Sequence, residues 1–256
     1  MVSVIIPMYN AKNYICEALS SVLIQHVDME VLILDDASTD GSADCVKHWI
    51  AAHPRMVKDT PVKVLSFAKN RGVAAMRKEG VMLAKGEYIA FLDADDCWEE
   101  GKLQKQLACM EATHACLCNT GRRLIKADGT QTDIVMHTPR KITLQKLEHS
   151  NYITCSSVLV RRDVMLQYPM KHSFLHEDYL TWLAMLHDYA YAVGIDEPLV
   201  RYRLSENGRS RNKCKAAWMT WLTYCYAGYS WLAACRMMLG YMVNGIRKYR
   251  GQGRKH

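Results

Sequence analysis

The chain has 256 residues, half of them hydrophobic, and a formal charge of +7. This length suits one domain or slightly more, and a sequence without repeats or low-complexity segments excludes the fibrous and disordered classes. The charge is uneven, because residues 201–256 hold 12 Lys or Arg and one acid, Glu206, so that segment carries +11 and the remainder −4. A strongly basic tail suits an anionic partner such as membrane lipid, nucleic acid or an anionic substrate.

Cysteine usage and the N-terminus indicate a reducing compartment. The ten cysteines include no CxxC pair, and Cys116 and Cys118 alone cannot form a zinc site. The opening MVSVIIPMYN lacks the basic region and apolar core of a signal peptide. We therefore expect a cytoplasmic protein with free thiols.

Apolar runs rich in β-branched residues alternate with helical patterns through the first hundred residues. Strands are predicted at 2–6, 30–36, 62–67 and 87–93, and helices at 13–23, 42–53 and 72–86. This alternation predicts an α/β fold built from βαβ units around a parallel sheet. Ligands of such sheets bind at the carboxyl ends of the strands, which is where Tyr9, Asp36 and Asp93 fall.

The pattern weakens beyond residue 100. The remaining predictions are helices at 101–112 and 176–189, a turn at Asp128-Gly129, a strand at 156–163, a polar loop at 205–213 and one or two helices at 214–250, with a break suggested by Gly228 and Ser230. We expect a nucleotide-binding half at 1–100, a catalytic and acceptor-binding half of the same domain at 101–212, and C-terminal helices at 213–256.

The segment YIAFLDADDCW places Asp93, Asp95 and Asp96 directly after a predicted strand. Carboxylates this close repel one another, and hard oxygen ligands suit Mg²⁺ or Mn²⁺ held between carboxylates and substrate phosphates. A solvated acidic turn is the alternative interpretation. The strand context, together with Asp35 and Asp36 at the end of the second strand, favours a metal site.

Five segments occur in order: VSVIIPMYNAKNYICEALSSVLIQ, EVLILDDASTDGS, NRGVAAMRKEG, GEYIAFLDADDCW and HEDYLTWL. Together they resemble family 2 glycosyltransferases of the GT-A fold, and most of all the bacterial enzymes that build surface polysaccharides. The resemblance covers roughly residues 1–212, and it is the combination of motifs that is specific. It implies a mostly parallel sheet flanked by helices, with a C-terminal helical extension.

The resemblance also implies how the nucleotide is held. The Pro-x-Tyr-Asn turn, with Pro7, would place Tyr9 against the base. Asp36, an acceptor-only carboxylate, would take the imide N–H of uracil and so favour uridine. Asn70 and Arg77 would line the nucleotide side. The neighbours of Arg77 depart from the family pattern, so a structural salt bridge is an equal alternative for that residue.

For the acidic segment, the resemblance implies a Mn²⁺ or Mg²⁺ cofactor on Asp95. Asp93 would lie near the ribose or the metal, and Asp96 near the donor sugar. The metal would neutralise the charge of the departing nucleoside diphosphate.

The HED segment matches the family's catalytic-base motif and implies that Asp178 takes the proton of the acceptor hydroxyl in an inverting transfer. A plain acidic first turn, favoured by the helix dipole, is the alternative and explains Glu177 well. The following loop would let Arg203, Arg209 or Arg211 close over the diphosphate.

These implications define an enzyme that moves a sugar from a UDP-sugar to a hydroxyl of a glycan or lipid-linked acceptor in bacterial surface polysaccharide synthesis. Two alternatives are a non-catalytic, membrane-docked partner of a polysaccharide complex and a sugar nucleotidyltransferase. The second needs a Gly-rich phosphate loop after the first strand, and PMYNAKNY contains no glycine.

The tail predicts where the enzyme works. Residues 216–235 carry no charge but are rich in Trp and Tyr, and the following segment ends in a Lys/Arg cluster. Aromatic side chains beside cations favour an anionic membrane surface over a membrane span. We expect peripheral attachment at the inner face of the cell membrane and no nucleic-acid partner. Packing of these helices on the catalytic domain is the alternative.

Overall fold

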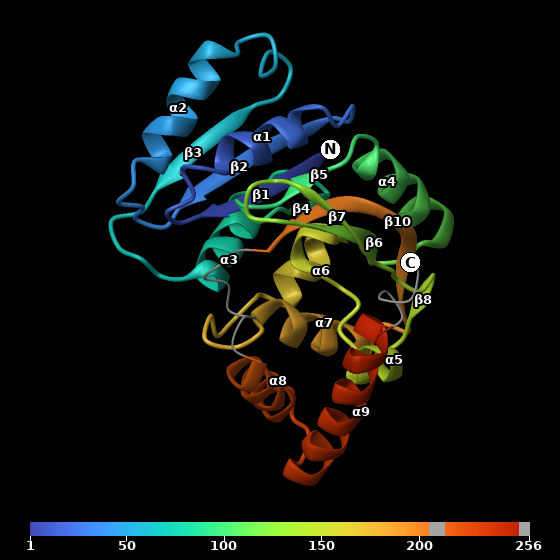
Figure 1. Cartoon of the computed structure of the whole chain (residues 1–256). Coiled ribbons are helices and arrows are strands. Elements are labelled where there is room, and N and C mark those ends of the chain that lie inside the picture. Colours follow the sequence, from blue (N-terminus) through green and yellow to red (C-terminus); the bar gives the residue numbers. More distant parts are fainter. Residues whose placement is uncertain (205–212, 251–256) are drawn as a thin grey trace.

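The computed structural model describes residues 1–204 and 213–250, and within them ten strands form one twisted sheet (Figure 1). The strand order is β3-β2-β1-β4-β9-β6-β10-β5, with β7 paired to β6 and β8 to β10. Helices α1 and α2 lie against one face of the sheet, whereas α3, α6 and α7 lie against the other (Figure 1).

The first half of the sheet is parallel, as the sequence predicts. Its elements are β1 (Val2–Met8), α1 (Ile15–Leu23), β2 (Met29–Asp35), α2 (Ser42–Ala52), β3 (Val62–Ser66), α3 (Val73–Leu83) and β4 (Tyr88–Phe91). Strands β1 and β2 are buried along their whole length because both faces are covered, which explains their continuous apolar runs.

The second half mixes strand directions. Its strands are β5 (Cys97–Trp98), β6 (Leu117–Ile125), β7 (Gln131–Met136), β8 (Lys141–Ile142), β9 (Leu159–Arg161) and β10 (Ala192–Arg203), and its helices are α4 (Lys102–Thr113), α5 (Leu144–His149), α6 (Arg162–Gln167) and α7 (Glu177–Asp188). Strand β9 pairs antiparallel with β4 and β6, whereas β6 and β10 are parallel.

One strand prediction needs correction. The strand expected at 156–163 is only three residues long, because a 3₁₀ turn occupies Cys155–Ser157 and α6 begins at Arg162. The backbone N–H of Arg162 donates to the carbonyl of Glu87, which closes the edge of the strand pair. The predicted turn at Asp128-Gly129 is confirmed: it joins the antiparallel strands β6 and β7.

The C-terminal segment forms a helical hairpin of α8 (Lys213–Tyr226) and α9 (Trp231–Arg250). The predicted break is confirmed, since Gly228 has a φ of 90° between the two helices. Helix α8 packs on α7, and α9 packs on α5. Among the residues described, none of the helices is both long and apolar enough to cross a bilayer.

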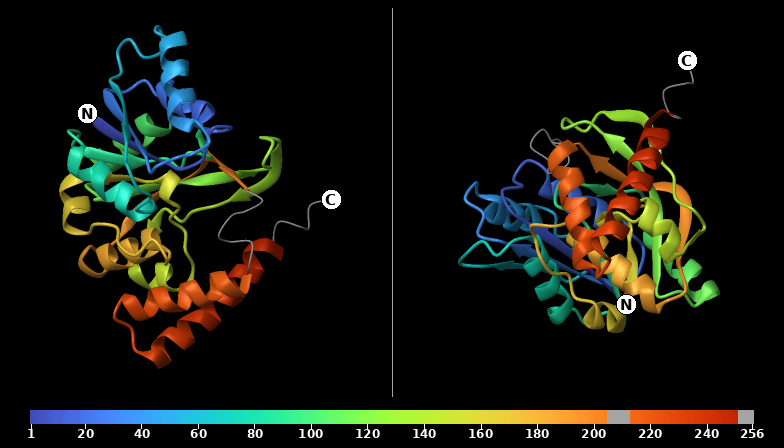
Figure 2. Two further views of the ribbon diagram at one scale, coloured as in Figure 1. Left: turned by 90° about the vertical axis from the view of Figure 1, so that its left-hand side faces the viewer. Right: turned by 90° about the horizontal axis from the view of Figure 1, so that it is seen from below.

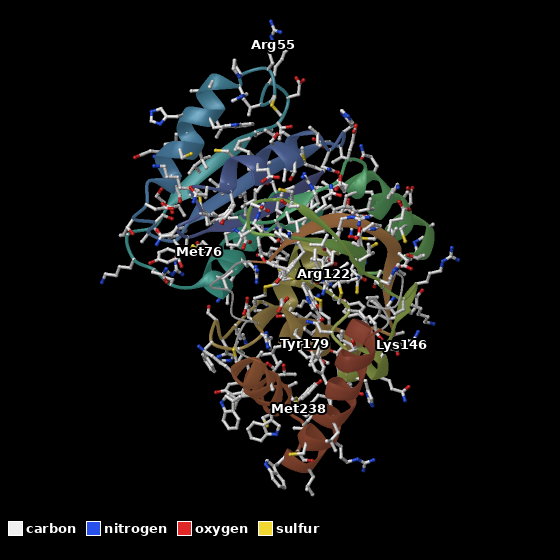
Figure 3. The ribbon with its side chains drawn as sticks, in the orientation of Figure 1. Arg55, Met76, Arg122, Lys146, Tyr179 and Met238 are labelled. Atoms are coloured by element: carbon white, nitrogen blue, oxygen red, sulfur yellow. The ribbon has the colours of Figure 1, made fainter. Side chains whose placement is uncertain are left out.

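Two apolar cores sandwich the sheet. The first, under α1 and α4, includes Ile15, Leu19 and Leu103. The second, under α3, α6 and α7, continues into the hairpin, and Tyr179 of α7 and Met238 of α9 both belong to it (Figure 3). The hairpin therefore shares its apolar core with the α/β body.

Candidate active site

Strands β1, β2 and β4 end at one edge of the sheet, because they are parallel and in register, with Met8 opposite Asp35. Tyr9 follows β1 directly, and its side chain is half exposed at this edge. Asn10 and Ala37 both have positive φ angles, 50° and 62°. Backbone strain of this kind is common at functional sites, so this edge of the sheet is the candidate ligand-binding site.

Asp36 is 2% exposed and holds the loop between β3 and α3. Its two carboxylate oxygens accept from the backbone N–H groups of Arg71 and Gly72, each at 2.7 Å. Gly72 has a φ of 86°, and an added Cβ would lie 2.7 Å from Oγ of Ser173, so the position requires glycine. Asn70 is exposed beside this anchored loop.

The acidic segment after β4 turns its three carboxylates in different directions. Asp93 faces the edge with its side chain 31% exposed. Asp95 is largely buried, and burial together with the charge of Asp93 raises the pKa of Asp95 to about 6. Asp96 is 1% exposed and accepts from Oγ of Ser156 at 2.6 Å and from the backbone N–H of Arg203 at 2.9 Å. The fold itself therefore engages Asp96, and its contact with the donor sugar stays a prediction.

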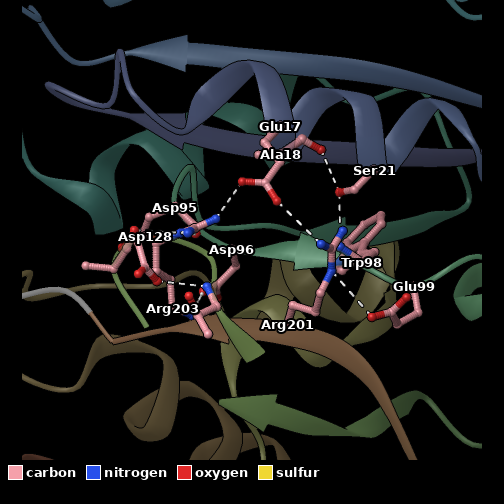
Figure 4. Close-up of polar contacts among 12 residues, drawn as sticks. Glu17, Ala18, Ser21, Asp95, Asp96, Trp98, Glu99, Asp128, Arg201 and Arg203 are labelled. Atoms are coloured by element: carbon pink, nitrogen blue, oxygen red, sulfur yellow. Dashed lines mark hydrogen bonds and ion pairs between the residues drawn. The ribbon is translucent and has the colours of Figure 1, made fainter. Parts of the chain in front are cut away.

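Arg203 is also engaged by the fold. Its guanidinium donates to the carbonyls of Asp95 and Ala127, at 2.8 and 3.1 Å, and to Glu17 at 2.6 Å (Figure 4). It also lies over the ring of Tyr14. All three nitrogens are engaged and the side chain is buried, so Arg203 fixes the acidic turn, and its contact with the diphosphate stays a prediction. Arg209 and Arg211 lie outside the described residues.

Arg77 connects the two groups of acids. From α3 it donates to Oε1 of Glu177 at 2.8 Å and to Oδ1 of Asp93 at 2.5 Å, and it is 2% exposed. The ion-pair alternative for Arg77 is thus the arrangement that the structure has. One buried cation ties the end of β4 to the beginning of α7, and so brings the carboxylates at both places to the same edge.

Asp178 lies at the first turn of α7, next to that network. Its side chain is half-buried, and its Oδ1 accepts from the backbone N–H of Tyr179 at 2.8 Å. Burial and the charge of Glu177 raise the pKa of Asp178 above the ordinary aspartate value. A carboxylate whose pKa is raised in this way holds a proton better, which suits a general base.

The donor groups at this edge fit a divalent cation only in part. Within residues 1–204 and the described part of the tail, no cluster of three His, Cys, Asp or Glu side chains could hold a metal by itself. Asp93 and Asp95 offer two carboxylates, and Mg²⁺ or Mn²⁺ sites often combine one or two carboxylates with substrate phosphates. The set fits a cation that arrives with a diphosphate.

Three residues of this arrangement have no role in the sequence-based assignment. Glu177 is the buried partner of Arg77, Ser156 donates to Asp96 and Glu17 receives Arg203. Only Glu177 carried a local signal, because it adjoins the predicted base. Ser156 and Glu17 meet the acidic turn only through the tertiary fold.

The chain matches known families over most of its length. Residues 3–168 match the sequence model of the family described as glycosyl transferase family 2. The chain is 37% identical over 225 residues to the putative teichuronic acid biosynthesis glycosyltransferase TuaG of Bacillus subtilis, with 88% of this chain and 87% of that protein aligned. It is 32% identical over 252 residues to the UDP-Glc:alpha-D-GlcNAc-diphosphoundecaprenol beta-1,3-glucosyltransferase WfgD of Escherichia coli, with 97% and 95% aligned.

Solved structures share the fold. The TM-score is 0.69 with S. aureus TarS in complex with UDP-GlcNAc, at 18% identity over 94% of this chain and 71% of that one. It is 0.70 with the mannosyltransferase PcManGT from Pyrobaculum calidifontis in complex with GDP-Man and Mn²⁺, at 18% identity over 93% and 68%. The chain therefore belongs to glycosyl transferase family 2 and has the GT-A fold. It is a glycosyltransferase, which sets aside both the nucleotidyltransferase and the non-catalytic alternatives.

Proposed function

We propose that the enzyme transfers a sugar from a UDP-sugar to a hydroxyl of a lipid-linked glycan in bacterial surface polysaccharide synthesis, with inversion at the anomeric carbon. The observation that carries this proposal is the Arg77 bridge, because it holds the acidic end of β4 and the first turn of α7 at one site. The names of TuaG and WfgD, which refer to teichuronic acid and to a diphosphoundecaprenol acceptor, support the acceptor class.

The donor nucleotide would lie along the edge formed by the loops after β1, β2 and β3. The half-exposed ring of Tyr9, which follows Pro7 and Met8, would stack on the base. Asp36 uses one lone pair of each oxygen for a backbone amide, and a carboxylate has further acceptor positions for an imide N–H. Asn70 is exposed beside that anchored loop.

Asp178 would take the proton of the acceptor hydroxyl as it attacks the anomeric carbon. In an inverting transfer the attack is opposite the leaving diphosphate, so the base and the diphosphate must lie on opposite sides of the sugar. Arg77 fixes this separation, since Asp93 lies on one side of its guanidinium and Glu177, the neighbour of Asp178, on the other.

Asp95 and Asp93 would hold a Mn²⁺ or Mg²⁺ ion, which supplies charge neutralisation to the departing diphosphate. Asp93 pairs with Arg77, whereas the Asp95 carboxylate forms no ion pair within the described residues. We therefore assign Asp95 as the main ligand. Arg203, through the carbonyl of Asp95 and the backbone contact to Asp96, keeps the turn in position.

The test is a panel of nucleotide sugars incubated with Mn²⁺, first without an acceptor and then with a synthetic diphosphate-linked N-acetylhexosamine. We expect slow release of UDP from a UDP-sugar, faster release with the acceptor, and a product whose anomeric configuration, read by NMR, is opposite to that of the donor. Retention of configuration would contradict the inverting mechanism, and release only of GDP or CDP would contradict the uridine donor.

We propose further that the enzyme works at the cytoplasmic face of an anionic membrane, where a lipid-linked acceptor lies. The formal charge of +11 in residues 201–256 supports this location.

A further inference from the structure

The hairpin of α8 and α9 leaves large apolar side chains uncovered. The side chains more than half exposed are Trp218 and Tyr226 of α8, and Trp231, Leu232 and Leu239 of α9, with exposed fractions of 52% to 67%. Trp218 stacks with Trp221 at a ring separation of 5.0 Å, and Trp221 packs against the core, so Trp218 is held in place on the surface of α8. An apolar patch of this kind on a soluble surface marks a site of interaction.

Helix α9 carries exposed apolar side chains beside its buried ones. Trp231, Leu232 and Leu239 fall within one sector of the helix, and all are exposed. Ala234 and Met238 are buried against the body. An amphipathic helix normally has polar side chains outside its buried stripe, so these exposed apolar side chains indicate a surface that interacts with a partner.

The hairpin is firmly attached to the body on its inner side. Tyr224 donates to the carbonyl of Glu148 at 2.7 Å, and Tyr229 donates to the carboxylate of Glu148 at 2.6 Å. The two helices form one end of the molecule, away from β2 and β3 (Figure 2). The apolar surface is thus a fixed platform at an extremity, where a large flat partner can reach it.

Charge identifies the partner. Glu206 is the last acid of the chain, so α8 and α9 contain no carboxylate side chain, whereas Lys215 and Arg236 are exposed. Arg236 lines a cavity of about 490 Å³, together with His149, Ser230, Leu232, Ala233 and Met237. Tryptophan and tyrosine prefer the headgroup region of a bilayer, and cations favour anionic lipid there.

We propose that the outer faces of α8 and α9 insert into the headgroup region of an anionic bilayer. Trp218, Trp231, Leu232 and Leu239 reach the boundary between headgroups and acyl chains, and Arg236 lies at the lipid phosphates. This inference rests on the proposed function, because membrane binding would bring the site to a lipid-linked acceptor. It makes membrane binding mainly apolar, with a smaller electrostatic part.

The test is flotation of the full chain with vesicles of equal parts phosphatidylglycerol and phosphatidylcholine, compared with phosphatidylcholine alone. The double variant Trp231→Ser/Leu232→Ser should lose at least about tenfold in partition, because removing one large apolar side chain from such an interface costs on the order of a factor of ten. The matched control is Met82→Ser/Leu83→Ser, which removes two exposed apolar side chains from α3 and should bind vesicles as the native chain does.

Arg236→Gln separates the electrostatic part. It should weaken partition to phosphatidylglycerol vesicles by a few-fold and leave partition to phosphatidylcholine unchanged, since about 1 kcal/mol attaches to each cation at an anionic surface. Folding of every variant is checked by circular dichroism and thermal unfolding. In the native chain, tryptophan fluorescence should be quenched by brominated lipid, and this quenching should fall in the Trp231→Ser/Leu232→Ser variant.

Three results would overturn the inference: no flotation of the native chain at low salt, equal flotation of the double variant, or equal loss in the control on α3. Sedimentation velocity adds a fourth. A dimer of the native chain that becomes a monomer in the double variant would show that a second copy covers this face instead. Release of UDP from a UDP-sugar without vesicles tests the proposed function separately, so either idea can fail while the other stands.

Discussion

Strands β2 and β4, which lie on either side of β1, both lead into acids, and the structure treats the two sets differently. After β2, Asp35 and Asp36 are both buried and accept backbone N–H groups, from Ser38 and from Arg71 and Gly72. After β4, Asp93 faces a buried arginine and Asp95 lies beside it with a raised pKa. Asp35 and Asp36 anchor loops, whereas the negative charge of Asp93 and Asp95 is only partly balanced by their surroundings.

The difference shows that a strand-end acid is not by itself a metal ligand. Backbone amides can balance a carboxylate when the loop folds around it, as it does at Asp36. At the end of β4, Asp96 is held by Ser156 and by the backbone of Arg203, whereas Asp93 pairs with Arg77. Substitutions at either strand end, or at the buried Lys102, test this difference.

The largest effect is expected from removing the cation at the end of β4. EDTA should abolish sugar transfer, and Mn²⁺ or Mg²⁺ should restore it, because the leaving diphosphate would otherwise meet Asp93 and Asp95 unscreened. Asp95→Asn should reproduce the loss even in excess metal. The Asp35→Asn variant, changed at the end of β2, should depend on metal as the native enzyme does. Full activity in EDTA would contradict the assignment of Asp95.

Replacing the proposed base comes next. Asp178→Asn should lower kcat by about 10²–10⁴-fold while UDP binding in calorimetry stays near the native value, since the group acts only on the acceptor. Asp188→Asn, at the other end of α7, is the control and should leave kcat unchanged. If Asp178→Asn turns over normally, the base lies elsewhere.

Breaking the bridge between the two acidic groups should affect stability as well as activity. Arg77→Met removes the cation that faces the buried Glu177, and breaking a buried ion pair typically costs about 3–5 kcal/mol in the free energy of unfolding. Arg161→Met breaks an exposed pair with Asp163 and should cost about 0–1 kcal/mol. Urea unfolding measures both; equal losses would show that Arg77 is no more than a surface charge.

Asp36→Ala tests the other strand end. Affinity for UDP and for CDP should both fall, because the loop at Arg71 and Gly72 loses two hydrogen bonds to a carboxylate, each worth about 1.5–3 kcal/mol. If the carboxylate also accepts the imide N–H, the affinity for UDP should fall further than the affinity for CDP, and the preference for uridine should narrow. Both affinities are measured by calorimetry with metal present. An equal fall for the two nucleotides would show that Asp36 only anchors the loop.

The sequence predicts the first half of the fold well because its signals are local. Each strand from β1 to β4 is a short apolar run, and each is followed by a helical pattern. Strand β10 escaped prediction because Asp196, Glu197 and Pro198 interrupt it, and its register against β6 shifts at Pro198. Its strand character comes from pairing with β6 across more than 70 residues of chain, which no local pattern contains.

The site divides in the same way. The acids at 36, 93, 95 and 178 have strand-end or helix-start signals, so the sequence alone marks them as candidates. The contacts of Arg203 could not be predicted, because its partners, Glu17 and Ala127, are distant in sequence. Arg77 left two alternatives open for the same reason: only the fold shows that Asp93 and Glu177 flank it.

Lys102 provides the contrasting case, a buried lysine that forms no ion pair with a carboxylate in the part of the chain that the structure describes. It is fully buried at the start of α4, donates to Oε1 of Gln106 at 2.7 Å and lies 4.0 Å from the ring centre of Trp98. Burial lowers the pKa of Lys102 to about 7, only partly opposed by the neighbouring Cys118. The unfolded chain, with an ordinary lysine pKa near 10.5, therefore binds more protons than the folded chain between these two values.

The sign of the pH dependence follows from that difference. Between about pH 7 and pH 10 the free energy of unfolding should rise with pH by up to about 1.4 kcal/mol per unit from this group, and below pH 7 the contribution should level off. Lys102→Met should remove this slope and be relatively most stabilising near pH 7. Lys105→Met, one turn along α4 and paired with Glu197 at the surface, should keep the slope. Urea unfolding at pH 7, 8 and 9 decides, because parallel curves for the native chain and Lys102→Met would mean that Lys102 keeps its charge in the folded protein.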